Sequence, residues 1–216
     1  MSWSQSETGA LALKAARGAG MTWGFAEEVS EAIKWLQGYG LPGVAALCRY
    51  LSWYNLQKSS LPEWSGASRE DNTYPYCPLS IGIEISDGLI QVPSDTEVSL
   101  GLIRQPLLLL PFVSNSVTEG SGLYAEDFCI SGALGKKNLK MHSDFSDTLL
   151  LDQSECFIRP LSKALVIAKT KTPALRLPDC YGGCIEVLDT FATRIYAPST
   201  ELSRSRGAGT NSITGD

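Results

Sequence analysis

The most unusual run of residue types in the chain is the segment 16–28, with the sequence ARGAGMTWGFAEE. It places the guanidinium of Arg17 beside two glycines, Gly18 and Gly20, just before the start of a predicted helix. Unpaired amides and the dipole at a helix N-terminus favour an anion, and a guanidinium can hold a carboxylate through two parallel hydrogen bonds. The segment therefore predicts a substrate site for a small carboxylate or phosphate, with Arg17, Gly18 and Gly20 as binding residues.

Trp23 and Glu27 complete this candidate site. We expect the indole of Trp23 to form a stacking wall, and the carboxyl group of Glu27 to act as a proton donor or acceptor. A structural interpretation stands beside this one, in which the glycines only turn one helix into the next and Arg17 caps carbonyl groups. In that interpretation Trp23 belongs to the core and Glu27 only complements the helix dipole.

Two cysteines are candidate nucleophiles. Cys77 precedes Pro78 at the entry to a predicted strand, and such junctions often display functional side chains. Cys184 follows two glycines where a helix is expected to begin, and a helix N-terminus favours the thiolate. We predict Cys77, with Glu27, as the catalytic residues; the alternative for either cysteine is a small apolar residue packed inside. A cysteine nucleophile usually needs a base, and His142 is the one histidine of the chain.

No metal and no cofactor are predicted. Cys180 and Cys184 have C-x3-C spacing, whereas zinc sites read from sequence use tighter pairs in sets of two. No Gly-x-Gly-x-x-Gly follows a strand, and the chain has no phosphate-binding P-loop. Neighbouring acids such as Glu27 and Glu28 point about 100° apart on a helix, so they do not by themselves form a catalytic pair.

Composition narrows the partners. The chain has 216 residues with 23 acidic and 18 basic side chains, a net charge of -5, and no extended basic cluster. Nucleic acid is therefore excluded, because a phosphate-binding face needs clustered Lys and Arg. The most apolar run, residues 107–113, is broken by Pro111 and is far shorter than the roughly 20 residues that cross a bilayer. We predict no membrane partner.

The N-terminus lacks the basic and apolar regions of a signal peptide, so we predict a cytoplasmic protein. Thiols are kept reduced in that compartment. The six cysteines are therefore expected to be free, with no structural disulfide even between Cys180 and Cys184.

Three amphipathic helices are expected to position the first candidate site. The first ends at Gly18 and Gly20, where two glycines make further helix costly, about 1 kcal/mol each relative to alanine. The second begins near Gly24 and runs to Gly38, with apolar residues at helical spacing. The third opens at Pro42, a proline that suits the first turn of a helix.

The rest of the chain predicts a long loop, then strands, then a helix. Leu79, Ile81, Ile83 and Ile85 alternate with other residues at period two, which is typical of a half-buried strand. Further strand candidates are short apolar runs, and some of them are equally compatible with helix: 89–92, 107–113, 124–131, 148–151, 156–159 and 164–168. Helical spacing returns over 185–196, and the tail from Gly207 is polar.

This order predicts an α+β fold, with N-terminal helices packed on a mainly antiparallel or mixed sheet and a C-terminal helix. We predict one domain over 1–216. It consists of a helical part at 1–57, a loop at 58–78, a β-rich part at 79–175, and a C-terminal helix and tail at 176–216.

Five motifs of the chain form a recognisable set: ARGAGMTWGFAEE, Trp35-Leu36, the segment 40–43 (GLPG), the segment 77–79 (CPL) and the segment 196–204 (YAPSTELSR). In these motifs the chain resembles a bacterial family known only as a domain of unknown function, number three-seven-two-six. The resemblance implies a single unit of about this size and no particular activity. The first helices also resemble those of sulfolactate and malate dehydrogenases, but the His-Gly signature of that family is absent, so neither its catalytic residues nor NAD is carried over.

Two functions follow from these patterns. The first is a cytoplasmic small-molecule metabolic enzyme that acts on an anionic, carboxylate-type substrate, with its reaction type open. The alternative is a noncatalytic subunit or interaction module of a larger assembly, which leaves a homo-oligomer or a partner subunit open. Its surface would be formed by the tryptophans of the first 64 residues, Trp3, Trp23, Trp35, Trp53 and Trp64, because tryptophan is enriched at interfaces.

Overall fold

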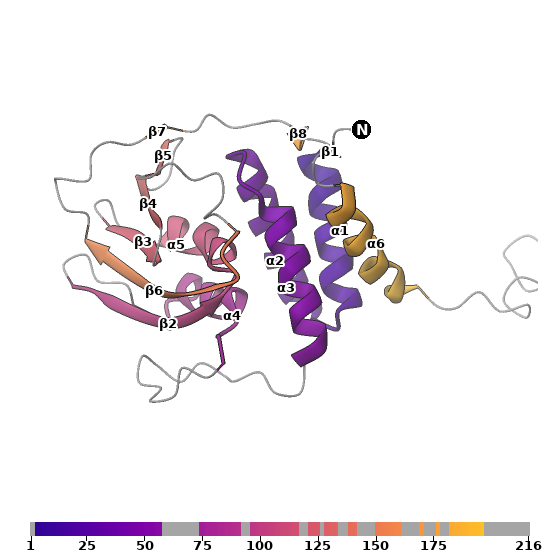
Figure 1. Ribbon diagram of the computed structural model, residues 1–216, viewed down its shortest axis with the longest axis horizontal. Coiled ribbons are helices and arrows are strands. Elements are labelled where there is room, and N and C mark those ends of the chain that lie inside the picture. The colour runs from indigo at the N-terminus through magenta and orange to yellow at the C-terminus, as the bar shows by residue number, and fades with distance from the viewer. Residues whose placement is uncertain are drawn as a thin grey trace, which may run out of the picture.

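The computed structural model describes residues 3–57, 74–91, 96–116, 121–125, 128–133, 138–141, 150–160, 169–170, 176–177 and 182–196. The helices α1, α2, α3 and α6 lie together in one part of the molecule, and the antiparallel sheet lies with α4 and α5 in the other (Figure 1). The predicted α+β class is confirmed, with N-terminal helices and a C-terminal helix. Residues 58–73 of the predicted loop over 58–78, together with His142, Cys180 and the tail from Gly207, lie outside the described residues.

The three predicted N-terminal helices are confirmed as α1 (Gln5–Gly18), α2 (Trp23–Gly38) and α3 (Gly43–Gln57). A capping box starts α1: the Ser4 hydroxyl accepts from the Glu7 N–H at 3.3 Å, and the Glu7 carboxylate accepts from the Ser4 N–H at 2.8 Å. Glycines in the left-handed conformation end the turns between the helices, Gly20 at φ 94° and Gly40 at φ 65°. The glycine and proline signals therefore located these boundaries correctly.

The segment predicted as a strand from Leu79 to Ile85 is wrong: it is the helix α4 (Pro78–Ser86). Cys77 caps its N-terminus, Pro78 occupies the first turn, and Gly88 at φ 72° follows its end. Gly82 faces the ring of Phe112 so closely that a Cβ there would come within 2.3 Å of it. Tertiary packing against this ring overrides the strand preference of the isoleucines.

The strand predicted over 107–113 is also wrong. Its residues form the 3-10 helix η1 (Pro106–Leu109) and the helix α5 (Leu110–Ser116). Leu107 to Val113 are buried without interruption. A helical segment covered on all sides has no polar stripe, so its sequence cannot be distinguished from that of a buried strand. Together α4, η1 and α5 fill the space between the N-terminal helices and the sheet (Figure 1).

The main sheet of the described residues has the strand order β2-β6-β3-β4-β5-β7, and every neighbouring pair in it is antiparallel. Its strands are β2 (Val98–Arg104), β3 (Ser121–Ala125), β4 (Phe128–Ala133), β5 (Asn138–Met141), β6 (Gln153–Pro160) and β7 (Lys169–Thr170). The predicted strands 124–131 and 156–159 fall within β3, β4 and β6. Residues 89–91 and Leu150 are not in strands, and 164–168 lies outside the described residues.

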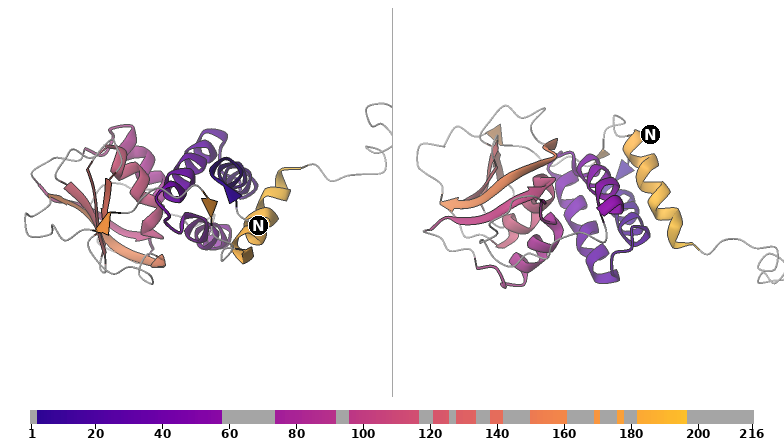
Figure 2. Two further views of the ribbon diagram at one scale, coloured as in Figure 1. Left: turned by 90° about the horizontal axis from the view of Figure 1, so that it is seen from above. Right: turned by 60° about the horizontal axis from the view of Figure 1, so that its bottom comes forward.

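The predicted C-terminal helix is confirmed as α6 (Gly182–Ala192), followed by the 3-10 turn η5 (Thr193–Ile195). It packs on α1 and α3, on the side of the helical region away from the sheet (Figure 2). A short antiparallel sheet pairs β1 (Trp3–Ser4), at the start of the described chain, with β8 (Arg176–Leu177), which precedes α6. No helix in the described ranges is long and apolar enough to span a bilayer.

Candidate functional site

The turn between α1 and α2 brings Arg17, Trp23 and Glu27 together on the surface. The Arg17 Nη1 donates to the Met21 carbonyl oxygen at 2.5 Å, and its guanidinium carbon lies 5.4 Å from the centre of the Trp23 ring. The Trp23 indole N–H donates to the Glu27 carboxylate at 2.9 Å, although the residue is 57% exposed. These contacts match the structural interpretation of Arg17 as a residue that caps carbonyl groups.

The two glycines of this turn have packing roles. A Cβ on Gly18 would lie 1.7 Å from the carbonyl oxygen of Phe191, so this glycine lets α6 approach α1 closely. Gly20 has φ 94°, a conformation that other residues rarely adopt. Anion binding by Arg17, Gly18, Gly20 and Trp23 stays a prediction, because their observed contacts are all within the protein.

Cys77 occupies a different place, the N-cap of α4. Its half-buried Sγ accepts a hydrogen bond from the Tyr50 hydroxyl at 2.8 Å and another from the Ser80 N–H at 3.3 Å. The Cys77 sulfur is therefore held in place by two donors at the start of α4.

The pKa values of two tyrosines of α3 are raised near this sulfur. Burial, with a smaller contribution from Cys77, raises the pKa of Tyr50 well above its ordinary value. The pKa of Tyr54 is raised by the same two causes in the same order. At neutral pH the Tyr50 phenol therefore keeps its proton and remains a hydrogen-bond donor to the Cys77 sulfur.

The register of α3 extends this group towards the sheet. The ring centroid of Tyr50 lies 5.9 Å from that of Trp53, and the guanidinium carbon of Arg104 lies 5.5 Å from the Trp53 ring. The backbone holds Arg104 beside the cysteine segment, because the Arg104 N–H donates to the Tyr76 carbonyl at 3.1 Å and the Tyr76 N–H donates to the Leu102 carbonyl at 2.8 Å.

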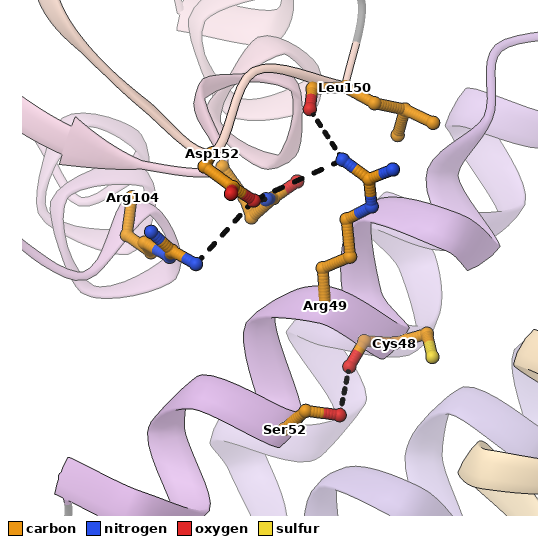
Figure 3. A network of polar contacts seen from close by, with 7 residues as sticks. Cys48, Arg49, Ser52, Arg104, Leu150 and Asp152 are labelled. Atoms are coloured by element: carbon orange, nitrogen blue, oxygen red, sulfur yellow. Dashed lines mark hydrogen bonds and ion pairs between the residues drawn. The ribbon is translucent and has the colours of Figure 1, made fainter.

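Two arginines share one carboxylate next to this group. Figure 3 shows Arg49 and Arg104 directed towards Asp152, with nitrogen-to-oxygen distances of 3.9 and 3.5 Å. Arg49 also donates to the Leu150 carbonyl at 2.8 Å. The Nε of Arg104 is buried and has no hydrogen-bond partner among the described residues. Two guanidinium groups against one carboxylate leave an excess of positive charge here.

Gln105 fixes the carboxylate between the arginines. Its backbone is left-handed at φ 48°, the one positive φ of a residue other than glycine in the described ranges. The Gln105 N–H donates to the Asp152 carbonyl and its side-chain amide to the Asp152 carboxylate, both at 2.9 Å. Strained backbone conformations cluster at functional sites because surrounding contacts must maintain them. This strain lies directly after Arg104.

We refer to the group of Tyr50, Trp53, Cys77, Arg104 and Asp152 as the Cys77–Arg104 junction. It combines a thiol that accepts two hydrogen bonds with an excess of positive charge, and so it offers a nucleophile and a binding group for an anionic molecule. The sequence identified Cys77, but Tyr50 and Arg104 were missed. No spacing signal could identify them, because residues 50, 77 and 104 meet only through the packing of α3, α4 and β2.

Other chemistry-bearing residues lie elsewhere. Glu28 lines an open pocket of about 530 Å³ between α2, α4 and α5, whose wall includes Glu31, Trp35, Tyr39 and Phe112. This pocket contains none of the predicted site residues. Within the ranges that the structure describes, no group of three or more His, Cys, Asp and Glu side chains could hold a metal ion.

Residues 3–76 match the family model described as a protein of unknown function, DUF3726. The match confirms the resemblance that the N-terminal motifs predicted, and it covers α1, α2 and α3. It includes Tyr50 and ends one residue before Cys77. No curated protein and no solved structure matches the chain.

Proposed function

We propose that the chain is a cytoplasmic enzyme that acts on a small carboxylate-bearing substrate, with the Cys77 thiol as nucleophile. Arg104 is the residue proposed to bind the negative charge of the substrate. The observation that carries the proposal is the pair of hydrogen bonds that the Cys77 sulfur accepts, at 2.8 Å from Tyr50 and at 3.3 Å from Ser80. These donors hold the sulfur in one position, and cysteine sulfur is an intrinsically strong nucleophile.

The substrate class follows from the charges around the sulfur. Arg104 is held in place by the Trp53 ring and by Asp152, and its buried Nε has no partner among the described residues. A substrate carboxylate would accept hydrogen bonds from the guanidinium of Arg104, and guanidinium-carboxylate hydrogen bonds are among the stronger ones in proteins. Arg49, on the other side of Asp152, adds positive charge near the same place.

In the proposed step the Cys77 sulfur attacks an electrophilic carbon of the bound substrate. A sulfur-carbon bond forms, the electron pair of the bond that breaks at this carbon moves to its former partner atom, and the leaving group takes up the thiol proton. Tyr50 orients the sulfur through its hydrogen bond, because its raised pKa keeps the phenol protonated at neutral pH. Arg104 orients the substrate through the carboxylate, so that proximity lowers the barrier.

The test compares two alkylating reagents of nearly equal size, neutral iodoacetamide and anionic iodoacetate. The rate at which each modifies Cys77 is measured by peptide mass spectrometry on the folded full-length chain, relative to free cysteine. We expect the junction to raise the iodoacetate-to-iodoacetamide rate ratio of Cys77 above that of free cysteine. Arg104→Gln should return the ratio to the free value, because the attracting charge is lost.

Arg17→Gln is the matched control, since it removes one positive charge from the α1–α2 turn and should leave the ratio at Cys77 unchanged. A ratio equal to that of free cysteine in the unmodified chain would contradict the proposal. So would an Arg104→Gln variant that keeps the full preference for iodoacetate while its thermal unfolding is unchanged.

The predicted anion site at Arg17, with Gly18, Gly20, Trp23 and Glu27, is a separate proposal. It would bind a carboxylate next to the start of α2, where the Arg17 side chain now holds the Met21 carbonyl. A carboxylate would have to compete with that hydrogen bond. Carboxylate binding that Arg17→Lys weakens, with the melting temperature unchanged, would support this second site.

The alternative function, a noncatalytic interaction module, is favoured by the exposure of Trp23, which is 57% accessible. Trp3, Trp35 and Trp53 are half-buried, and Trp64 lies outside the described residues. In this alternative the tryptophans would contact a second copy or a partner subunit. Iodide quenching of the isolated chain tests it: an emission that iodide leaves unquenched would remove its main support, and a monomer by sedimentation would exclude the homo-oligomer.

A further inference from the structure

Two thiols from distant parts of the chain meet between α3 and α6. Cys48, in the middle of α3, is buried, and Cys184, in the first turn of α6, is half-buried. The helices that carry them pack on each other, and the two thiols lie close enough for Cys184 to contribute to the raised pKa of Cys48. The Cys48 side chain points away from the contacts between Arg49 and Asp152 (Figure 3), so this thiol pair is separate from the Cys77–Arg104 junction.

The packing of the two helices supports the contact along their length. Two turns beyond Cys48, the Asn55 side chain of α3 accepts a hydrogen bond at 2.9 Å from Arg194, which lies ten residues after Cys184. The same helices therefore touch near both ends of their shared surface. A second helix, α1, also fixes the position of α6, because Gly18 of α1 packs closely against the backbone of Phe191. The two thiols are thus kept near each other by contacts that do not depend on them.

We propose that Cys48 and Cys184 form a reversible disulfide when the protein meets hydrogen peroxide, and that this bond fastens α6 to α3. Both thiols are free in the structure. The disulfide would be a modification that appears under oxidation and disappears on reduction, and it does not depend on the function proposed for Cys77.

The chemistry divides between the two sulfurs. Cys184 is the more exposed thiol and is the one that peroxide reaches first. Its sulfur attacks one oxygen of hydrogen peroxide, the oxygen-oxygen bond breaks, and the leaving hydroxide takes up the thiol proton as water. The product is a sulfenic acid on Cys184.

Cys48 then completes the reaction. Its sulfur attacks the Cys184 sulfur, a sulfur-sulfur bond forms, and the sulfenic hydroxyl leaves as water with the Cys48 proton. In total two thiols are oxidised by two electrons and one peroxide is reduced to two waters. Burial, and then the neighbouring Cys184, raise the pKa of Cys48 to about 12, so this thiol is protonated at neutral pH and is a poor first target for peroxide.

The experiment treats the folded full-length chain with a small excess of hydrogen peroxide and then blocks free thiols with N-ethylmaleimide under denaturing conditions. Reduction followed by iodoacetamide marks the cysteines that were in disulfides, and peptide mass spectrometry identifies them. We expect Cys48 and Cys184 to acquire the second label together, in equal yield. Treatment with a reductant before the maleimide step should abolish that label.

Variants separate the two roles. Cys184→Ser should prevent oxidation of Cys48, whereas Cys48→Ala should leave Cys184 as a sulfenic acid that dimedone traps. Cys156→Ser is the matched control, because this buried thiol of β6 has no part in the pair. It should leave the disulfide yield unchanged.

A second readout needs no variant: oxidation should raise the thermal unfolding midpoint of the unmodified chain, and reductant should reverse the rise, because a bond across so long a loop restricts the unfolded chain. Complete maleimide labelling of Cys48 and Cys184 after peroxide would overturn the proposal. A disulfide of Cys184 with Cys180 or Cys77 in place of Cys48 would overturn it as well.

Discussion

The α1–α2 turn and the Cys77–Arg104 junction differ in how their residues come together. The turn is a continuous segment, and each of its unusual residues has a local task. Arg17 donates to the Met21 carbonyl, Gly18 allows α6 to pack closely on α1 at Phe191, and Gly20 adopts a left-handed conformation. At the junction, residues 50, 77 and 104 come from three elements and are joined by contacts across the molecule.

At the α1–α2 turn, packing explains the unusual local composition. At the Cys77–Arg104 junction, the reactive group is recognised by the side chains that the fold brings around it. The guanidinium at the turn is already engaged with a carbonyl and with the Trp23 ring. The guanidinium of Arg104 keeps a buried Nε without a partner among the described residues. Substitutions at the turn are therefore expected to change the stability of the fold, and substitutions at the junction are expected to change the reactivity of Cys77.

The largest effect is expected at Gly18. In Gly18→Ala the new Cβ would lie 1.7 Å from a backbone oxygen of α6, so α6 must move away from α1. We expect a loss of about 3 kcal/mol in the free energy of unfolding, at the upper end of overpacking effects. Urea unfolding followed by circular dichroism measures it. A stable variant that loses carboxylate binding would instead make the turn a ligand site.

The second effect concerns alkaline pH at the junction. The folded pKa of Tyr50 is raised above its ordinary value of 10.0, mainly by burial, so the unfolded chain releases this proton at lower pH than the folded chain. The stabilising contribution is complete below pH 10 and is lost as pH rises towards the folded pKa, by up to about 1.4 kcal/mol per pH unit. Cys48, raised from 9.0 to about 12, acts in the same direction from pH 9 upward.

Tyr50→Phe isolates the tyrosine in this pH dependence. Urea unfolding between pH 8 and pH 11 should show a shallower loss of stability in the variant, because one of the titrating groups is gone. The same variant should slow alkylation of Cys77 at pH 7 by about fivefold, since a hydrogen bond worth about 1 kcal/mol to the sulfur is lost. Equal alkylation rates would mean that Tyr50 does not influence the nucleophile.

A smaller effect is expected for Arg17→Ala. The variant loses the hydrogen bond to the Met21 carbonyl and the contact with the Trp23 ring, both partly exposed. We expect about 1 kcal/mol of destabilisation, as for an ordinary hydrogen bond. Chemical denaturation measures the change. Unaltered stability would show that these contacts do not stabilise the fold, and it would favour a role of Arg17 in ligand binding.

The smallest effect is the control for Gly18. Gly24 lies in the first turn of α2, and a Cβ there would meet nothing within 4 Å. Gly24→Ala should therefore leave stability unchanged or raise it by less than about 1 kcal/mol, because alanine is the better helix former. A large loss on this substitution would indicate that glycines in the turn are required for a reason other than packing.

The sequence predicted the N-terminal helices well because the residues that start and stop them act through local backbone preferences. Gly18, Gly20, Gly38 and Pro42 each stop or start a helix through their own backbone preferences, and the helix ends agree with them. The region 78–116 could not be predicted in the same way. Its apolar residues are buried between two layers, and Gly82 is explained only by the distant ring of Phe112.

The candidate site was predictable in part for a related reason. Cys77 stands out beside Pro78, which also marks the start of a helix, although that helix was taken for a strand. The left-handed Gln105 and the charge shared by Arg104 and Asp152 depend on how β2 and β6 are aligned. Such alignment is a property of the folded chain, and no local pattern encodes it.

One experiment compares the α1–α2 turn and the Cys77–Arg104 junction directly as carboxylate-binding sites. The rate of Cys77 alkylation by neutral iodoacetamide is measured against increasing succinate, in the unmodified chain, in Arg17→Lys and in Arg104→Lys. Lysine keeps the charge but not the two-pronged grip on a carboxylate. We expect succinate to protect Cys77 in the unmodified chain and in Arg17→Lys, and we expect this protection to be lost in Arg104→Lys. Protection that is lost in Arg17→Lys and kept in Arg104→Lys would contradict this expectation.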